Sequence, residues 1–430
     1  MRKRTLLCLA HMSGKEMDFI KEAFDTNWVV PLGPNVNGFE EDLEKFIESG
    51  EATPAFTDPK YTNLAEEKVV ALSAGTAAVH LALLACGVGP GDEVMVQSFT
   101  FCASSHPVTY LGATPVFVDS EPDSWNMDPE LLDRAIADRI AKTGKTPKAI
   151  VPVYLYGMPA RIDEIMEVGR KYGIPVVEDA AEGLGSRFDG RVCGTFGRYG
   201  VLSFNGNKMI TTSGGGALIC PDAEAAKKIL WYATQARESY PYYQHEAIGY
   251  NYRMSNICAG IGRGQMTIID EHIAHHRHVQ QLYRELLKDI EGITLHDNPS
   301  PRYDSNFWLC TITLDPALRV KGEEKAYAEV IKGAVGGAAG VTHETKSSHT
   351  AVEPNRNVEG MRIFLDEAGV ESRPLWKPMH LQPVYAKNPA YTNGVSENLF
   401  RVGLCLPAGP LVTDEDVRYI ASKIREAIDA

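Results

Sequence analysis

Short apolar runs alternate with helix-length amphipathic segments from about residue 66 to residue 220, and no other feature of the chain restricts its fold as much. Consecutive parallel strands need a long crossover connection, which is usually a helix. The order therefore predicts an α/β fold with a mostly parallel central sheet and helices on its faces. Its strands are expected at 69–72, 93–96, 115–118, 149–153 and 175–178.

The alternation fades after residue 266. A polar helix is expected at 271–287, and a smaller α+β region follows it. A chain of 430 residues is long enough for one large domain and a second, smaller one. We therefore expect a large domain at 1–266 and a small C-terminal domain at 267–430.

Three local patterns stand outside this scheme. Ser13-Gly14-Lys15-Glu16 has the S-x-x-E form of a capping box and predicts an N-terminal helix. The segment 49–63, with two prolines, is interpreted as an irregular insertion. The segment 333–357 is rich in glycine, and it is either a binding lid or only an insertion.

Composition excludes several classes of protein. A net charge of −13 argues against a nucleic-acid surface, because phosphate backbones are bound by basic patches. The eight cysteines form no C-x-x-C pair, so they are expected to be reduced, as in a cytoplasmic protein without a disulfide or zinc framework. The first ten residues superficially resemble a signal peptide, but their apolar stretch is too short. No other segment approaches the length of a membrane span.

One lysine and one aspartate suggest a cofactor. Asp179 follows an apolar strand, and Lys208 stands later in a polar turn, just before the glycine cluster 213–216. A lysine amine can hold pyridoxal 5′-phosphate (PLP) as a Schiff base, and a carboxylate can pair with the protonated pyridine nitrogen. Alone, a loop lysine is usually solvated and an aspartate after a strand is often an N-cap. Together and in this order, they make a PLP enzyme the leading hypothesis.

The first strand-to-helix turn could hold the cofactor phosphate. Gly75 and Thr76 follow the strand at 69–72 and open a helix that is expected to stop at Gly87. A helix N-terminus presents free N–H groups and a positive dipole end to an anion. Small residues are common at any such turn, so this pattern alone is weak. Phe101, after the next strand, is either an aromatic that stacks on the pyridine ring or an ordinary core residue.

Four histidines in the helix at 271–287 raise the alternative of a metal site. His272 and His276 have the i, i+4 spacing of two ligands on one helix face. No H-E-x-x-H string accompanies them, and their charged neighbours Glu271 and Arg277 indicate a solvated face. We therefore predict no metal there.

Longer motifs add a resemblance that covers nearly the whole chain. They are LSAGTAAVHLAL at 72–83, GATPVFVD at 112–119, LYGMP at 155–159, EDAAE at 178–182, SFNGNK at 203–208 and GYNYRMSN at 249–256. In these motifs the chain resembles the DegT-type nucleotide-sugar aminotransferases, a branch of the fold-type-I, aspartate aminotransferase-like PLP enzymes. RPLWKPMH at 373–380, with NW at 27–28 and PLGP at 31–34, resembles the transaminases of UDP-N-acetylbacillosamine-type 4-amino sugars.

The resemblance implies how the cofactor is held. Lys208 matches the lysine of the covalent internal aldimine, which later moves a proton between substrate and cofactor. Asp179 matches the pyridinium partner. Glu182 lies close to the ring hydroxyl, where a carboxylate requires protonation or a hydrogen bond through another group, so its role stays open. The residues matched to the phosphate are Gly75, Thr76, Ser203 and, from the neighbouring subunit, Asn251.

The resemblance also implies partners and a reaction. Arg253, Lys377 and His380 are candidate donors to the substrate, although they are equally ordinary as structural residues. Asn251 implies a homodimer with shared active sites. The expected reaction moves an amine from L-glutamate to the 4-keto group of a nucleotide-linked 6-deoxy sugar, with UDP-2-acetamido-2,6-dideoxy-4-ketohexose preferred, in amino-sugar or surface polysaccharide biosynthesis.

Two alternatives remain open from the sequence. The substrate could be a GDP- or dTDP-linked keto sugar. A chain with the same cofactor site could also be a non-catalytic, PLP-binding regulatory protein. A related branch that performs dehydration has histidine at the lysine position, and Lys208 argues against it.

Overall fold

The computed structural model describes residues 3–48, 66–327 and 352–428. The insertion expected at 49–63 lies outside these residues, as does most of the segment 333–357.

The large domain is built on a sheet whose strands all run parallel except one. Strands β1 (Lys68–Leu72), β9 (Gly216–Cys220), β8 (Tyr199–Ser203) and β5 (Val177–Asp179) are neighbours in that order. Beyond β5 come β4 (Ala149–Val151), β2 (Glu93–Gln97), β3 (Thr114–Val118) and β14 (Ala390–Tyr391). Isolated parallel bridges connect β4 and β5, and only β9 runs against its neighbours. The mostly parallel sheet is confirmed, with strand limits within two residues of those expected.

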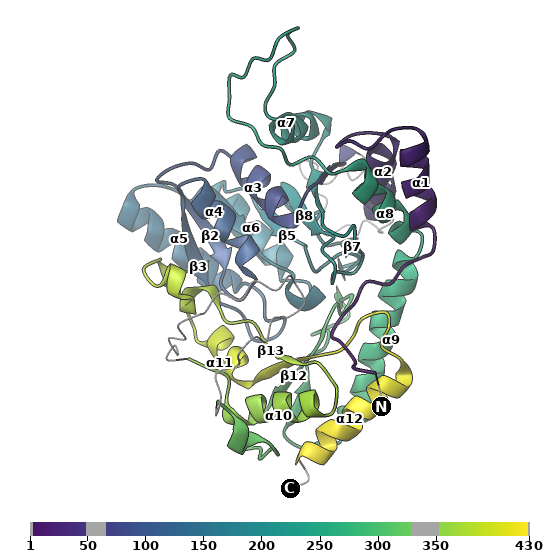
Figure 1. Cartoon of the computed structure of the whole chain (residues 1–430). Coiled ribbons are helices and arrows are strands. Elements are labelled where there is room, and N and C mark those ends of the chain that lie inside the picture. Colours follow the sequence, from purple (N-terminus) through teal and green to yellow (C-terminus); the bar gives the residue numbers. More distant parts are fainter. Residues whose placement is uncertain (1–2, 49–65, 328–351, 429–430) are drawn as a thin grey trace.

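Helices bury both faces of this sheet (Figure 1). On one face lie α3 (Gly75–Ala85), α4 (His106–Tyr110) and α7 (Ala223–Ala233); on the other lie α2 (Pro34–Glu48), α5 (Pro129–Thr143) and α6 (Ile162–Tyr172). Alternate strand residues serve the two faces: Val70 and Leu72 pack with α3, while Val69 and Ala71 join the opposite core. Burial on both faces explains why the strands are continuously apolar in sequence.

The N-terminal helix α1 (Glu16–Asp25) starts later than a capping box at Ser13 predicts. Glu16 does reach back, and its carboxylate accepts hydrogen bonds from the Ser13 N–H (2.8 Å) and the Gly14 N–H (2.9 Å). The Ser13 hydroxyl, however, accepts from the Lys15 N–H (3.0 Å), so it does not cap the helix. Only half of the box forms. Both α1 and α2 pack on α8 (Asn256–Met266).

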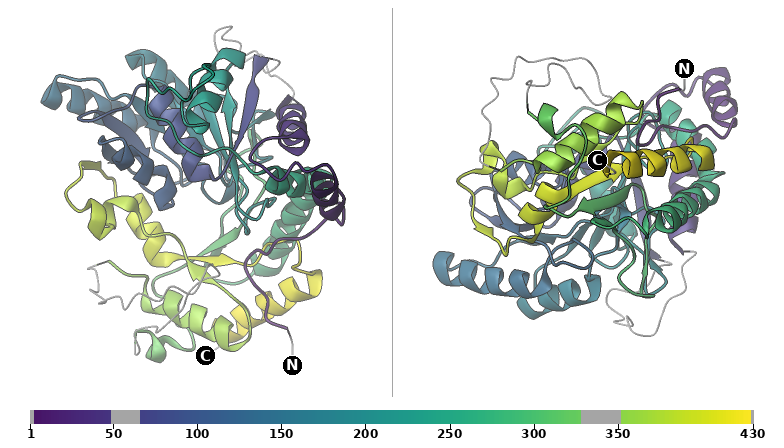
Figure 2. Two further views of the ribbon diagram at one scale, coloured as in Figure 1. Left: turned by 45° about the horizontal axis from the view of Figure 1, so that its top comes forward. Right: turned by 90° about the horizontal axis from the view of Figure 1, so that it is seen from below.

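The small domain follows the long helix α9 (Ile269–Leu287). Its antiparallel sheet has the order β10 (Ile293–Leu295), β12 (Cys310–Leu314), β15 (Gly403–Leu406) and β13 (Arg373–Pro374). Helices α10 (Arg356–Glu367) and α12 (Asp414–Ile428) cover this sheet and lie side by side in the view from below in Figure 2. A short sheet joins β11 (Tyr303–Asp304), β6 (Arg187–Phe188) and β7 (Arg191–Val192), and α11 (Val395–Val402) precedes β15.

Two segments cross the expected boundary at residue 266. Near the C-terminus, β14 adds a parallel strand beside β3 of the large domain. Near the N-terminus, Thr5 pairs with Val370 of the small domain. The division at 266 therefore stays a prediction, and any division of this chain must allow for these exchanges.

All eight cysteines are free. Among the described residues, no helix combines the length and the apolar character that a membrane crossing requires.

Candidate active site

Most of the predicted cofactor residues meet beside the ends of β5 and β8 and the start of α3. Lys208 lies in the turn after β8, and its Nζ is 3.0 Å from the Glu182 Oε1. Both side chains are largely withdrawn from solvent, with 13% of Lys208 and 3% of Glu182 exposed. An amine and a carboxylate are thus paired in a sheltered site rather than at the surface, unlike the usual solvated lysine of a loop.

Asp179 ends β5 with its carboxylate fixed. Its Oδ2 accepts from the Ser104 hydroxyl (2.6 Å), and its Oδ1 accepts from the Ala181 N–H (3.1 Å). Burial raises the pKa of Asp179, although the hydrogen bond from Ser104 and the positive charge of Lys208 oppose the rise. A cation placed against this carboxylate would relieve the cost of its burial. Asp179 therefore suits a protonated ring nitrogen.

Glu182 is oriented by an unusual backbone. The Tyr156 N–H donates to its Oε2 (2.7 Å), while its Oε1 faces Lys208. Tyr156 has φ 55° and ψ 16°, in the left-handed region that residues other than glycine seldom adopt. Burial raises the pKa of Glu182 and Lys208 opposes this. The required hydrogen bond to the Glu182 carboxylate is present, while its place beside a ring hydroxyl stays a prediction.

The start of α3 leaves its N–H groups available. Ala74 at the N-cap makes no side-chain capping bond, and the first turn has no acidic residue. A Cβ on Gly75 would lie 3.0 Å from the Ser203 Cβ and 3.2 Å from its Oγ, so a side chain there would crowd that hydroxyl. Gly75 and Ser203 therefore form a cradle suited to a phosphate dianion, while the part played by Thr76, next to Gly75, stays a prediction. Together with Asp179 and Lys208, this cradle fits PLP.

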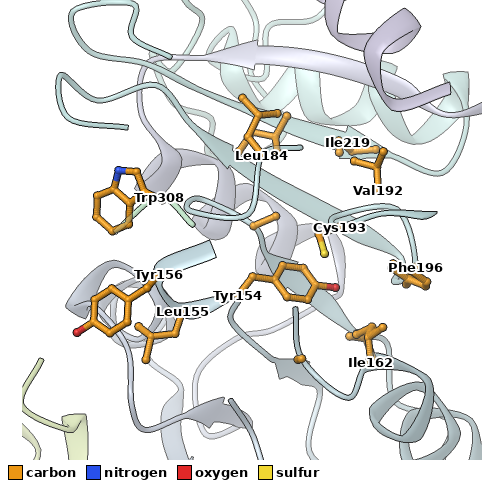
Figure 3. Packing of buried hydrophobic residues seen from close by; sticks show 14 of the residues in the cluster. Tyr154, Leu155, Tyr156, Ile162, Leu184, Val192, Cys193, Phe196, Ile219 and Trp308 are labelled. Carbon is orange, nitrogen blue, oxygen red and sulfur yellow. The ribbon is translucent and has the colours of Figure 1, made fainter. Parts of the chain in front are cut away.

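Aromatic side chains that the sequence did not single out surround the amine. The Lys208 Nζ lies 4.1 Å from the ring centroid of Trp308, a cation–π distance. Trp308 also donates its Nε1–H to the Asn207 carbonyl (2.6 Å), next to Lys208. Figure 3 shows Tyr156 pointing away from Tyr154, on the side where Trp308 lies. No local sequence pattern predicts that Trp308 lies in the site, because it comes from the loop before β12 of the small domain.

Phe101 and Trp376 extend this aromatic lining. Their ring centroids are 5.4 Å apart, and Trp376 is equally far from the Tyr156 ring. The Trp376 N–H donates to the Tyr156 hydroxyl (2.9 Å). Phe101 is 55% exposed, so it is not an ordinary core aromatic. Its exposed ring beside the site is consistent with stacking on a flat ligand.

The three predicted substrate residues lie in two different parts of the molecule. Lys377 and His380 follow Trp376; Lys377 donates to the Val352 carbonyl (3.3 Å), and the His380 Nδ1 lies 2.6 Å from the Ser98 hydroxyl. Arg253 is instead ion-paired with Glu40 and donates to the Ala71 carbonyl (3.1 Å), so its guanidinium is already engaged within the large domain. Asn251 is exposed and forms an isolated antiparallel bridge with Thr234, at the base of the loop after α7.

The prediction of a solvated histidine face on α9 is wrong for two members. His272 and His276 are 4% and 0% exposed, because they lie on the inner side of α9 while Glu271 is exposed on another side. The exposed His278 pairs with Asp414. Within the part of the chain that the structure describes, no three histidine, cysteine or acidic side chains are grouped to hold a metal.

Fold and site together define a fold-type-I PLP-dependent enzyme. Comparison with known proteins is more specific: residues 11–338 and 325–425 match the model of the DegT/DnrJ/EryC1/StrS aminotransferase family, and the chain belongs to that family. The predicted family and cofactor are thereby confirmed. The chain is therefore a member of a family of PLP-dependent sugar aminotransferases.

Individual relatives cover nearly the full length. EpsN of Bacillus subtilis (strain 168), provisionally named a pyridoxal phosphate-dependent aminotransferase, is 40% identical over 423 residues, 97% of this chain and 94% of its own. GDP-perosamine synthase of Escherichia coli O157:H7 is 32% identical over 415 residues, 96% of each chain. The crystal structure of a DegT DnrJ EryC1 StrS aminotransferase from Brucella abortus has a TM-score of 0.79 at 28% identity, covering 97% of this chain and 96% of its own.

Proposed function

We propose that this enzyme transfers an amine from L-glutamate to the 4-keto group of a nucleotide-linked 6-deoxy sugar, with UDP-2-acetamido-2,6-dideoxy-4-ketohexose as the preferred acceptor. The observation that carries the chemical part is the sheltered pair of Lys208 and Glu182 beside the fixed carboxylate of Asp179. The amine, the buried anion and the phosphate cradle are the groups that PLP chemistry requires.

Each cofactor residue has a distinct role in this proposal. When bound, PLP supplies an electron sink for the charge left on the substrate carbon. Lys208 would bind the cofactor through its Nζ, and once the donor amine has displaced that nitrogen from the cofactor, the freed amine would carry the proton to and from the substrate carbon. Asp179 keeps the ring nitrogen protonated. Gly75, Thr76 and Ser203 anchor the phosphate through N–H and hydroxyl groups.

The aromatic residues and Glu182 orient the reacting groups. Phe101 covers the cofactor ring and excludes water from one side of it. Trp308 covers the Lys208 amine, while Glu182 fixes its direction. Lys377 and His380 lie in the segment that follows Trp376, and they are the proposed donors to the diphosphate or the sugar. Arg253 takes a structural part instead, through its pair with Glu40.

A homodimer with shared sites completes the proposal. Asn251 is exposed, so in the proposed dimer it serves a second copy of the chain, whose cofactor phosphate it would contact. The loop before Asn251 projects from the body of the molecule beyond α7 (Figure 1) and exposes large apolar side chains: Tyr240, Tyr242, Tyr243 and Ile248. Exposed apolar surface of this kind is typical of an interface between proteins.

The nucleotide is the part most open to test. The relative named GDP-perosamine synthase supports a GDP-linked acceptor as the second candidate. Turnover should be measured with L-glutamate and, in parallel, UDP-, GDP- and dTDP-linked 4-keto-6-deoxy sugars. A preference in kcat/KM for the UDP sugar is expected, and a preference for the GDP or dTDP sugar would replace it with the alternative.

The same preparation separates an enzyme from a PLP-binding regulator. The visible absorbance of the bound cofactor should shift when L-glutamate is added, because the amine is taken up in the first half of the reaction. A cofactor band that glutamate and other amino acids leave unchanged would contradict the proposed donor chemistry.

A further inference from the structure

A buried histidine of α9 holds the loop that carries Lys208. The His272 Nδ1 lies 3.1 Å from the carbonyl oxygen of Met209, which directly follows Lys208. A carbonyl only accepts, so the Nδ1 must carry the proton and the Nε2 is the acceptor for the Nδ1–H of His11, at 3.1 Å. Burial lowers the pKa of His272, in keeping with this neutral form.

A second histidine, one turn further along α9, holds the loop that carries Trp308. The His276 Nδ1 donates to the carbonyl of Phe307, which directly precedes Trp308, at 3.1 Å. Trp308 in turn places its ring over the Lys208 amine and donates to the Asn207 carbonyl. The carbonyls on both sides of Lys208 are therefore bound, one by His272 and the other by Trp308.

These contacts form a closed circuit. It runs from α9 through His272 to the Lys208 loop, across to Trp308, and back through His276 to α9. Side chains four residues apart lie on one helix face at a fixed separation of about 5–6 Å. An apolar residue would fill the same buried space, whereas an imidazole costs free energy there unless it is hydrogen-bonded.

We propose that His272 and His276 are positioning residues, which together fix the Lys208 amine against the Trp308 ring. The spacing that resembles a metal site thus serves to hold two loops of the active site at a set distance. This inference rests on the proposed role of Lys208 as the lysine that binds the cofactor.

The test uses paired substitutions in the full-length protein, with cofactor release measured on the holoenzyme and labelling measured after the cofactor has been removed. His272→Leu and His276→Leu remove the donor, while His272→Asn and His276→Asn keep a side-chain N–H close to the position of Nδ1. His275→Leu is the matched control, because His275 lies on the same helix and its Nε2 contacts a backbone carbonyl, that of Gly409 (3.2 Å), which belongs to neither loop.

Two readouts other than turnover are measured. The first is the release of cofactor on dialysis. The second is the acetylation of Lys208 by acetic anhydride in cofactor-free protein, followed by mass spectrometry with the exposed Lys288 as reference. The leucine variants at 272 and 276 should release cofactor about tenfold faster, the effect of losing one hydrogen bond to a buried carbonyl. They should also change the labelling rate of Lys208 but not of Lys288. The asparagine variants and His275→Leu should behave like the wild type.

The outcomes that overturn the inference are specific. Equal effects of His275→Leu would mean that α9 acts only through general stability. Wild-type release and labelling in the leucine variants would mean that the two contacts position nothing. If a leucine variant does not fold, the asparagine variant decides, since altered release in a folded asparagine variant contradicts the role given to the Nδ1–H. Absence of lysine-bound cofactor in the wild type would instead refute the proposed function.

Discussion

The two sides of the Lys208 amine are built in different ways. On the large-domain side, Asp179 and Glu182 come directly from the end of β5 and present charged groups. On the small-domain side, Trp308 comes from a distant loop and presents an aromatic face, held by backbone hydrogen bonds. The first side carries the groups that change or balance charge, whereas the contact that the second side makes with the amine is an uncharged aromatic ring.

Because of this difference, we expect the two sides to contribute differently to the reaction. Charged groups after parallel strands can perform and support proton transfer, since the strand ends place them at one edge of the sheet. Aromatic and hydrogen-bonded groups can only restrict where the amine lies and how much water reaches it. We therefore expect substitutions on the large-domain side to reduce the rate far more than substitutions on the small-domain side.

Lys208→Ala should have the largest effect, because it removes the proposed proton carrier and the attachment of the cofactor. Transamination should be abolished, while pyridoxamine phosphate, which needs no bond to the lysine, should still bind as a free ligand. In the wild type, borohydride should fix the cofactor to Lys208, which peptide mapping can locate. Recovery of the reduced adduct on another lysine would show that Lys208 is not the lysine that binds the cofactor.

Asp179→Asn should have the second-largest effect. Its chemical step should be about three orders of magnitude slower, on the scale of a broken buried charge pair. Glu178→Gln is the matched control. Glu178 is also fully buried, but its carboxylate faces the opposite way and accepts from the Gly194 N–H (2.8 Å) and the Phe196 N–H (2.6 Å). The control should lose stability and keep its turnover per folded molecule within a few-fold. Wild-type rates in Asp179→Asn would show that another group holds the ring nitrogen.

A third side of the site, from a second subunit, can be tested by complementation. Lys208→Ala and Asn251→Asp should each be nearly inactive, the latter because a carboxylate would face a phosphate. In mixed dimers one site carries both defects and the other carries neither. Random exchange makes half of the dimers mixed, so about a quarter of all sites should recover. No recovery, despite exchange shown by tag pull-down, would mean that Asn251 does not serve a partner.

Trp308→Phe tests the small-domain side and should cost only about tenfold in kcat/KM. Phenylalanine keeps a ring over the amine but leaves the Asn207 carbonyl without its donor, which costs about 1–3 kcal/mol. Trp125→Phe is the control, since Trp125 stacks on His296. If Trp308→Phe slowed the reaction as much as Asp179→Asn does, the proposed difference between the two sides would be wrong.

The sequence predicted the large-domain side well and the small-domain side poorly. Asp179 and the α3 turn could be placed because each lies at the end of an expected strand, and strand ends share one edge of the sheet; Lys208 was recognised by its polar turn and its order after Asp179. Trp308 and Tyr156 could not, because their roles depend on loops that meet only in three dimensions and on a left-handed backbone at residue 156. The motifs identified the family, but they did not predict the contacts of Trp308 and Tyr156.

The buried histidines illustrate a signal that was present and misinterpreted. Glu271 and Arg277 adjoin the histidines in sequence, but neighbours in sequence point in different directions on a helix. Positions 272, 276, 279, 283 and 287 recur at helical spacing and form the buried stripe of α9. Following that period instead of the adjacent charges would have placed both histidines inside.

The last effect we expect is on acid stability rather than on the rate, and it belongs to the small-domain side. Burial lowers the pKa of His276 to about 3, and the nearby His272 and His275 add to this. An unfolded chain has its histidine pKa near 6.5. Above that pH the imidazole is neutral in both states and its contribution to stability is complete. As the pH falls below 6.5, only the unfolded chain takes up the proton, so stability is lost progressively down to about pH 3.

His276→Asn isolates this effect, because asparagine can keep a donor for the Phe307 carbonyl and does not titrate. Between pH 7 and pH 5 the free energy of opening α9 should fall by about 2 kcal/mol less in the variant than in the wild type. Hydrogen exchange of the α9 amides, corrected for the intrinsic effect of pH, measures this difference. Tyr283→Phe is the control: Tyr283 is buried on the same helix, and burial raises the pKa of its hydroxyl well above 10, so it does not titrate in this range. If His276→Asn loses as much protection as the wild type, protonation of His276 is not what weakens α9 in acid.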